Sequence, residues 1–450
     1  MIPRVPSGSH RPDPAPSRSI QVAAAPASGT PRPRALAADA DILIVSKNIE
    51  LSSAADNNAA SHVGEPSVAN NGDVVFYTGN WYAAVSSDGG TTYQYVDPYN
   101  SFPNPAGMEF CCDQVALYLS QIDTFVWLMQ YTERPGGGNL QRLAFAKTAD
   151  ATQGAWRLYD IAPDSLGLPN AFLDFPDLAV GSNFLYATTN VFTGNAWTAT
   201  AIVRIPLAEI LADSISAEHA LSRDNFSFRV AQNCIDRAFW ASHQDTSTLR
   251  VFSWDETSAQ PNFEDIAVAS WDNSDYNSLT PSNVNWLGRA DPRLTGATRA
   301  GQELWFAWGA GRGGANQRPH PYVQIARVRA ADLTLIENIN IWDPTTAICY
   351  AALGSNAINE VATSYMMGGG NIEPSHVVGF LTSPQNHVYT AQGSRGPSDQ
   401  QWGDYLTVRA RMPEDNTFIA TGYTLNRLRK KSRFWKNGHE TGSQREPRFN

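Results

Sequence analysis

Apolar and polar positions alternate in short runs over most of the chain, and turn residues separate these runs. In seven places a polar or proline-containing segment leads into an apolar strand, a polar turn and a second strand that ends in aromatic or small polar residues. Such pairs predict β-hairpins, whereas only residues 206–212 have a strong helical signal. The second strands are expected at residues 74–78, 125–129, 184–188, 238–242, 303–307, 360–365 and 417–421.

The hairpins recur at intervals of 48–63 residues, which is the size of a four-stranded propeller blade. We therefore predict an all-β fold, a seven-bladed β-propeller over residues 41–426. The seventh unit reaches a basic tail directly after its second strand, so a strand within residues 41–51 is expected to complete this blade and close the ring. A β-sandwich followed by a second domain is the competing architecture. The even composition of the seven units favours one ring.

The two ends of the chain differ from this body. Residues 1–40 contain eight prolines among Ala, Ser and Arg, and residues 427–450 are basic and lack an apolar period. Neither segment can form a packed core, so both are predicted to be disordered. They carry net charges of +4 (residues 1–34) and +6 (residues 427–450) in a chain of net charge −10, which leaves −20 between them. An acidic body repels phosphate backbones, so we expect no nucleic-acid binding by the folded part.

Composition narrows the class of protein further. Aromatic residues make up 11% of the 450 residues and charged residues only 17%, which argues against a disordered chain and a long coiled coil. No run of about 18 apolar residues predicts a membrane span. No signal peptide is visible, because the apolar run at residues 20–27 is short and contains Pro26. We nevertheless expect a secreted or extracytoplasmic monomer, given the glycan chemistry described below.

The chain has four cysteines, Cys111, Cys112, Cys234 and Cys349. They are too few for a disulfide-stapled scaffold and lack the CxxC spacing of a metal site. The adjacent pair can close a vicinal disulfide at a binding loop in an oxidising compartment, or remain as buried thiols. The sequence leaves both open. No cofactor is predicted, and calcium in an acidic funnel is left as an unspecified option.

One local motif is specific in both residue type and spacing. Residues 86–93 read Ser-Ser-Asp-Gly-Gly-Thr-Thr-Tyr, so that Asp88 can accept backbone N–H groups in a turn and Gly90 can take a positive φ. The segment resembles the Asp-box (BNR repeat) of the sialidase-like β-propeller superfamily, in which the box is structural. True sialidases carry Arg-Ile-Pro before the first Asp-box. Here Arg204-Ile205-Pro206 comes after it, so the resemblance does not extend to sialic acid cleavage.

The candidate site follows from propeller topology. The entry to each innermost strand and the exit of the second strand lie on the same face, around the central funnel, and polar residues there are not demanded by core packing. The candidates for catalysis are Glu65, Asp113, Asp177, His243, Asp404 and Tyr405. The candidates for substrate binding are Trp81, Tyr131, Asn190, Arg289, Asp291, Arg293, Trp308, Tyr365 and Trp402.

Two reactions suit these residue types. A glycoside hydrolase needs two carboxyl groups, one protonated and one ionised, ~5–10 Å apart, and the acidic strand entries can supply them. A polysaccharide lyase needs a base, an acid and a cation that neutralises a uronate. The candidates for these three roles are His243, Tyr405 or Tyr365, and Arg289 or Arg293. We predict a glycan-active enzyme with hydrolysis as the leading reaction and lysis as the second. A non-catalytic carbohydrate-binding or scaffold propeller is the alternative from another class.

Overall fold

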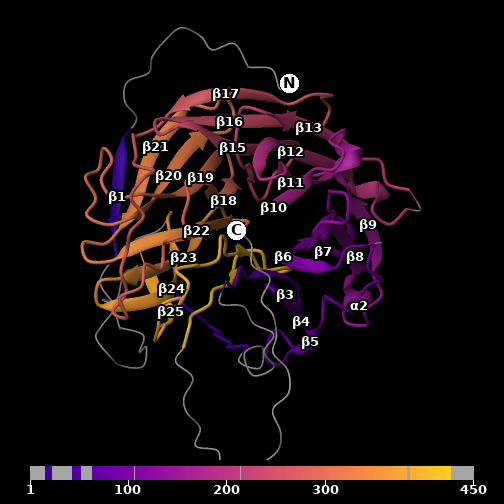
Figure 1. The fold of residues 1–450 in the computed structure, drawn as a ribbon, viewed down its shortest axis with the longest axis horizontal. Helices are drawn as coiled ribbons and strands as arrows, with labels where there is room; N and C mark the ends of the chain where they lie inside the picture. Colours follow the sequence, from indigo (N-terminus) through magenta and orange to yellow (C-terminus); the bar gives the residue numbers. More distant parts are fainter. Residues whose placement is uncertain are drawn as a thin grey trace, which may run out of the picture.

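The computed structural model describes residues 16–22, 43–51, 63–105, 107–212, 214–382 and 386–426. The described chain is almost entirely β-strand, arranged as sheets around a central axis (Figure 1). The expected all-β propeller is therefore present. Among the described residues, no helix has the length and apolar character needed to cross a membrane.

The first three blades are antiparallel sheets of four strands that follow one another in the chain. Blade one has β2 (Ser67–Asn71), β3 (Val74–Gly79), β4 (Tyr82–Ser86) and β5 (Gln94–Val96). Blade two has β6 (Phe110–Leu119), β7 (Thr124–Tyr131), β8 (Gln141–Lys147) and β9 (Arg157–Ile161), with η1 (Ser120–Ile122) and α2 (Thr148–Ala151) in its turns. Blade three has β10 (Phe172–Val180), β11 (Phe184–Thr193), β12 (Ala196–Pro206) and β13 (Glu218–Ser222). A short 3-10 turn, η2 (Pro163–Leu166), precedes blade three, and a second one, η3 (Leu207–Glu209), lies between β12 and β13. The strong helical signal of residues 206–212 corresponds to η3.

The next three blades repeat this pattern. Blade four has β14 (Arg229–Val230), β15 (Arg237–Asp245), β16 (Thr248–Asp255) and β17 (Asn262–Ala267). Blade five has β18 (Leu294–Ala300), β19 (Glu303–Ala310), β20 (Tyr322–Arg329) and β21 (Leu335–Trp342). Blade six has β22 (Ala347–Ser355), β23 (Val361–Gly369), β24 (Ile372–Phe380) and β25 (His387–Ala391). The first strand of each blade is innermost in the ring (Figure 1).

The prediction of seven blades is wrong, because the structure has six. The seventh unit forms only a ladder of two three-residue strands, β26 (Val408–Ala410) and β27 (Phe418–Ala420). This ladder lies against blade one, where Asn70 Nδ2 donates to the Met412 carbonyl at 2.7 Å. It also lies against blade six, since a Cβ on Gly354 would stand 2.4 Å from the Val408 carbonyl oxygen. The pair closes the ring without outer strands.

The predicted closure strand within residues 41–51 is also absent. Residues 43–51 are described, but none of them is in a β-strand. The segment contacts blade one through Lys47 Nζ, which donates to the Gly89 carbonyl at 2.8 Å, and blade six through Asn48 Nδ2, which donates to the Thr390 carbonyl at 2.6 Å. Ile44 is 80% exposed. The apolar pattern of residues 43–51 suggested a strand, but β27 has only three residues and offers too short an edge for this segment to pair with.

A strand that the sequence analysis did not predict lies in the proline-rich segment. β1 (Ser17–Gln21) pairs in parallel with β21 and adds a fifth strand to the outer edge of blade five. Ile20 and Val22 are buried there, which anchors the segment by apolar burial. The rest of residues 1–40 and the basic tail at 427–450 lie outside the described residues.

Residues 86–93 form the predicted turn, between β4 and β5. Asp88 Oδ1 accepts the backbone N–H groups of Thr91 at 3.0 Å and Thr92 at 2.9 Å. Gly90 has φ +79°, which a residue with a Cβ adopts rarely. Asp88 is thereby occupied in holding the turn.

Candidate functional site

Several charged residues predicted from different hairpins lie close to one another in the structure. Glu65 precedes β2, Asp113 lies in β6, Arg289 and Arg293 precede β18, and Asp404 precedes β26. We call these five residues the mouth cluster. The loops that carry them come from opposite ends of the chain, and the ring brings them together.

Asp404 is the centre of the mouth cluster. Its Oδ2 atom lies 3.0 Å from Arg289 Nη2 and 3.1 Å from Arg293 Nη2. Its Oδ1 atom is buried and has no hydrogen-bond partner among the described residues. A buried polar atom without a partner is uncommon in a folded protein, so Oδ1 is available to a bound molecule.

Glu65 lies directly beside Asp404. Its Oε1 atom accepts the backbone N–H of Asp404 at 3.0 Å, and its Oε2 atom accepts Asn80 Nδ2 at 2.8 Å. Gly403 permits this approach, because a Cβ at that position would stand 2.9 Å from Glu65 Cγ. Arg289 Nη2 is 4.0 Å from Glu65 Oε1. The same guanidinium atom therefore faces both carboxyl groups, and the two oxygens are no more than about 7 Å apart.

Burial and crowding change the acidity of two members. Burial, together with the charge of Asp404, raises the pKa of Glu65 from its ordinary value of 4.5 to about 7. Burial also raises the pKa of Asp113 well above its ordinary value, and the charges of Glu65 and Asp174 add to the effect. Like charges that share a site disfavour ionisation of one another. Burial and crowding therefore favour the protonated forms of Glu65 and Asp113.

The two arginines differ in exposure and in the number of their contacts. Arg293 is 12% exposed, its Nε atom lies 2.6 Å from Asp291 Oδ2, and its guanidinium stacks over the Phe175 ring at 4.2 Å. Arg289 is 41% exposed and reaches solvent. Burial lowers the pKa of both guanidinium groups, but the neighbouring carboxylates raise it by more, so the pKa of each is raised above its ordinary value. Arg293 is therefore a fixed positive group, and Arg289 is able to contact an incoming ligand.

A small pocket opens beside Asp404. One of the lining residues that the sequence analysis did not select is Tyr350, whose backbone has φ +60° and whose buried hydroxyl has no hydrogen-bond partner among the described residues. Burial raises the pKa of this hydroxyl well above its ordinary value. No motif signals Tyr350, since it lies in the apolar start of a strand. The pocket is lined by Arg289, Asp291, Arg293, Thr295, Gly309, Cys349, Tyr350 and Asp404.

Tyr405 helps to hold the segment that carries Asp404. It is 3% exposed, and its hydroxyl donates to the Gln114 carbonyl at 3.3 Å. Gln114 in turn accepts Trp127 Nε1 at 2.8 Å. These contacts fix the segment that carries Asp404.

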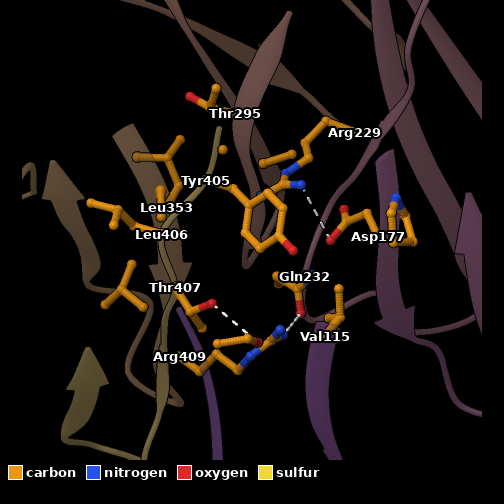
Figure 2. Close-up of a pocket in the computed structure, with 16 residues that line it drawn as sticks. Val115, Asp177, Arg229, Gln232, Thr295, Leu353, Tyr405, Leu406, Thr407 and Arg409 are labelled. Atoms are coloured by element: carbon orange, nitrogen blue, oxygen red, sulfur yellow. Dashed lines mark hydrogen bonds and ion pairs between the residues drawn. The ribbon is translucent and has the colours of Figure 1, made fainter. Parts of the chain in front are cut away.

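Besides Tyr405, two candidates for catalysis lie outside the mouth cluster. Asp177 lies in a separate channel pocket (Figure 2), where its Oδ1 atom is 3.5 Å from Arg229 Nη1. His243 packs against Trp271 and Trp308, with ring centroids 4.7 and 4.9 Å away. Burial lowers the pKa of His243 to about 3. None of its described contacts is with the mouth cluster.

Most aromatic and amide candidates are buried within the blades. Tyr131, Trp308, Tyr365 and Trp402 are fully buried, and Asn190 is 2% exposed. The Tyr365 hydroxyl is 2.9 Å from His387 Nδ1, and the Trp402 ring stacks on Tyr423. Only Trp81 is an exposed aromatic candidate, at 42%, and it directly follows Asn80, the partner of Glu65.

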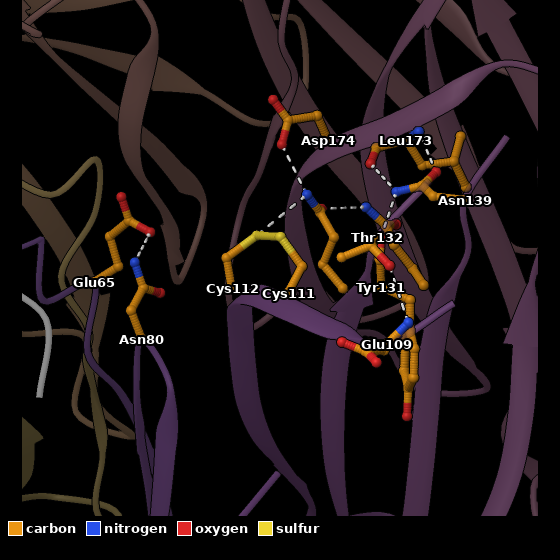
Figure 3. Close-up of a disulfide and its surroundings, with 12 residues drawn as sticks. Glu65, Asn80, Glu109, Cys111, Cys112, Tyr131, Thr132, Asn139, Leu173 and Asp174 are labelled. Carbon is orange, nitrogen blue, oxygen red and sulfur yellow. Dashed lines mark hydrogen bonds between the residues drawn. A yellow bond between two sulfur atoms is a disulfide. The ribbon is translucent and has the colours of Figure 1, made fainter. Parts of the chain in front are cut away.

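Cys111 and Cys112 form a disulfide at the start of β6 (Figure 3). Of the two alternatives left by the sequence, the structure has the vicinal disulfide, whereas Cys234 and Cys349 are buried free thiols. Gln130 Nε2 lies 3.8 Å from Cys112 Sγ and donates to Asp174 Oδ1 at 3.0 Å. The disulfide is half-buried and directly precedes Asp113 of the mouth cluster.

Within the described residues, no group of three or more His, Cys, Asp or Glu side chains is arranged to hold a metal ion. Arg204 of the Arg-Ile-Pro segment lies in β12 and pairs with Glu218 at 2.5 Å. Its guanidinium also stacks over the Trp254 ring. It is therefore part of the blade packing.

Comparisons with known proteins find similar structures only. No model of a protein family matches the sequence, and no curated protein matches it significantly. An α-L-arabinofuranosidase from Fusarium graminearum is 10% identical, with a TM-score of 0.38 over 73% of this chain and 92% of that one. A sialidase from Trypanosoma rangeli is 10% identical, with a TM-score of 0.40 over 70% of this chain and 53% of that one.

A prolyl endopeptidase is 14% identical, with a TM-score of 0.32 over 66% of this chain, and this chain spans only 37% of its length. The structural neighbours thus include sialidases and propeller glycosidases, but also peptidases. At these identities and TM-scores the likenesses carry no information on the reaction.

Proposed function

We propose that this protein is a glycoside hydrolase that acts at the mouth cluster. The observation that carries the proposal is the pair Glu65 and Asp404, in which the pKa of Glu65 is about 7 and both carboxyl groups face Arg289. A glycosidase needs one carboxylic acid that still holds its proton at working pH and one carboxylate. This pair supplies both.

Glu65 is the general acid in this scheme. Its proton passes to the glycosidic oxygen as the bond from that oxygen to the anomeric carbon breaks. Asp404 either takes a proton from a water that attacks the anomeric carbon, or attacks this carbon itself to form a glycosyl-enzyme that water then hydrolyses. The upper limit of about 7 Å on the distance between Glu65 Oε1 and Asp404 Oδ2 is compatible with the shorter of the two glycosidase geometries, ~5–5.5 Å. Asp113, whose pKa is raised by burial, is a hydrogen-bonding partner for a sugar hydroxyl, and the exposed Trp81 offers a face for a sugar ring.

The lyase alternative has less support. Its proposed base, His243, is enclosed by Trp271 and Trp308, and its proposed acid Tyr365 is bonded to His387. Tyr405 and both arginines remain near the site. A non-catalytic carbohydrate-binding propeller would use the same mouth cluster to bind a sugar without cleaving it.

We further propose that the protein acts outside the cytoplasm. The support is the Cys111–Cys112 disulfide, since disulfides persist in oxidising compartments.

A polysaccharide panel tests the proposal. Purified protein is incubated with neutral and uronate-containing glycans, and both reducing ends and the absorbance of an unsaturated uronate are followed. Hydrolysis gives reducing ends alone, and lysis gives both signals. If neither signal appears, the proposed hydrolase is contradicted and the non-catalytic binding protein is favoured. On any substrate that is cleaved, Glu65→Gln is expected to lower kcat at least ~100-fold. The exposed Glu133→Gln is the matched control, and a fully active Glu65→Gln variant removes Glu65 from the mechanism.

A further inference from the structure

A second polar pocket lies in the central channel, next to the mouth. Thr295 lines both pockets, and Tyr405 lines this one while its neighbour Asp404 belongs to the other. The cavity is small, about 20 Å³, which is enough for one small group. Figure 2 shows Arg229, Asp177, Gln232 and Arg409 around it, together with the apolar side chains of Val115 and Leu353.

Two guanidinium groups share one carboxylate in this channel pocket. Arg229 and Asp177 are 8% and 4% exposed and lie 3.5 Å apart (Nη1 to Oδ1). Asp177 also accepts the Val230 backbone N–H at 3.4 Å. Arg409 has no carboxylate in direct contact among the described residues. Its Nη1 atom donates to the neutral Gln232 Oε1 at 2.5 Å, and its buried Nε atom has no partner.

The charges therefore do not balance. The charged groups that act on Arg409 are Asp177, which is attractive, and Arg229, which is repulsive. Burial lowers the pKa of Arg409 to about 10, so it still carries its charge at neutral pH. Two positive charges face one negative charge in a buried space, and an uncompensated buried charge is costly.

We propose that the channel pocket binds a small monovalent anion of the chloride type, held by Arg409 and Arg229. One negative charge restores the balance, whereas a dianion would be repelled by Asp177. The small volume and the apolar lining by Val115 and Leu353 favour a weakly hydrated ion over a larger oxyanion. The unpartnered Nε atom of Arg409 is the donor left for this ion. The proposal is independent of the reaction at the mouth.

The test uses the full-length protein and two measurements. In crystals grown in sodium bromide, we expect an anomalous bromide peak in contact with the Arg409 guanidinium. In solution at constant ionic strength, replacing sodium gluconate by chloride or bromide should raise the melting temperature saturably, by about 3 °C at saturation. Sodium sulfate should give no saturable rise, only the gradual increase that a salt excluded from the protein surface produces.

Variants assign the effect to the pocket. Arg409→Gln should abolish the saturable rise, while Arg329→Gln, which alters an exposed arginine paired with Asp332, should keep it. The proposal is overturned if the channel has no bromide peak, if chloride and gluconate give the same melting temperature, or if sulfate stabilises and bromide does not. Should Arg409→Gln fail to fold, the bromide map of the wild-type protein decides alone.

Discussion

The mouth cluster and the channel pocket lie next to each other and use the same residue types, but they have opposite excess charge. The mouth combines Glu65, Asp113 and Asp404 with two arginines, and Asp291 adds a further carboxylate. The channel combines Arg229 and Arg409 with a single aspartate, Asp177.

The two regions relieve their excess charge differently. A carboxylate can take up a proton near neutral pH, and the raised pKa values of Glu65 and Asp113 show that burial drives this uptake. A guanidinium cannot lose its proton at that pH, even with the pKa of Arg409 lowered to about 10. An acid-rich pocket therefore becomes a proton donor, and an arginine-rich pocket recruits an anion.

The largest expected effect concerns the mouth. Asp404→Asn keeps the shape of the side chain but removes the carboxylate, so we expect at least a ~100-fold loss of turnover with folding intact, typical of removing an acid or base. The measurement is kcat on a cleaved glycan, with circular dichroism as the folding check. Asp236→Asn, whose side chain is 82% exposed, is the control. Full activity of Asp404→Asn would exclude Asp404 from the mechanism.

The next effect is the pH dependence of stability. Because folding raises the pKa of Glu65 from 4.5 to about 7, its contribution is fully present below pH 4.5 and is lost as the pH rises through 7. Between pH 5 and 7 the free energy of unfolding should fall by about 2 kcal/mol on this account. Glu65→Gln should remove this fall. Buried His243 and His376, with pKa values lowered to about 3 and 4, are common to both proteins and cancel in the difference.

Denaturant titrations at several pH values measure this difference. Parallel curves for the wild-type protein and Glu65→Gln would mean that Glu65 does not take up a proton on folding. The contrast between an acid-rich mouth and an arginine-rich channel would then lose its basis.

A smaller effect is expected in the channel. Asp177→Asn removes the only carboxylate that faces Arg229 and Arg409, so the pocket should attract an anion more strongly. We expect the chloride concentration at half-maximal stabilisation to fall by about tenfold. A thermal titration with chloride at constant ionic strength measures it. An unchanged midpoint would show that Asp177 does not contribute to the charge balance.

The smallest effect on stability concerns the disulfide. Replacing Cys111 and Cys112 by serine should change the free energy of unfolding by less than about 1 kcal/mol, because a bond between adjacent residues constrains almost no chain in the unfolded state. KM should also rise, since Asp113 loses a fixed neighbour. Kinetics and denaturant unfolding of the double variant measure both quantities, with the reduced wild-type protein as the comparison. A loss of folding would contradict this expectation.

The local patterns were informative about strands and turns. Alternation of apolar residues located the hairpins, and the Ser86–Tyr93 spacing located a turn in which Asp88 binds backbone N–H groups. Topology then indicated that strand entries converge, and Glu65, Asp113 and Asp404 do lie together with Arg289. The same rule also selected Trp308, Tyr365 and Tyr131, which are buried in blades, because a position near a strand end does not reveal whether a side chain faces the funnel.

The sequence by itself determined the class of fold, the hairpin period and the acidic strand entries, since these depend on residues close together in the chain. Only the tertiary structure decided that there are six blades, that β1 covers blade five, and that residues 43–51 pair with no strand. It also decided that Asp404 faces two arginines while Arg409 lacks a carboxylate of its own. These outcomes depend on burial and on contacts between residues hundreds of positions apart, such as Glu65 and Asp404, and no local pattern encodes the charge balance of a site assembled in this way.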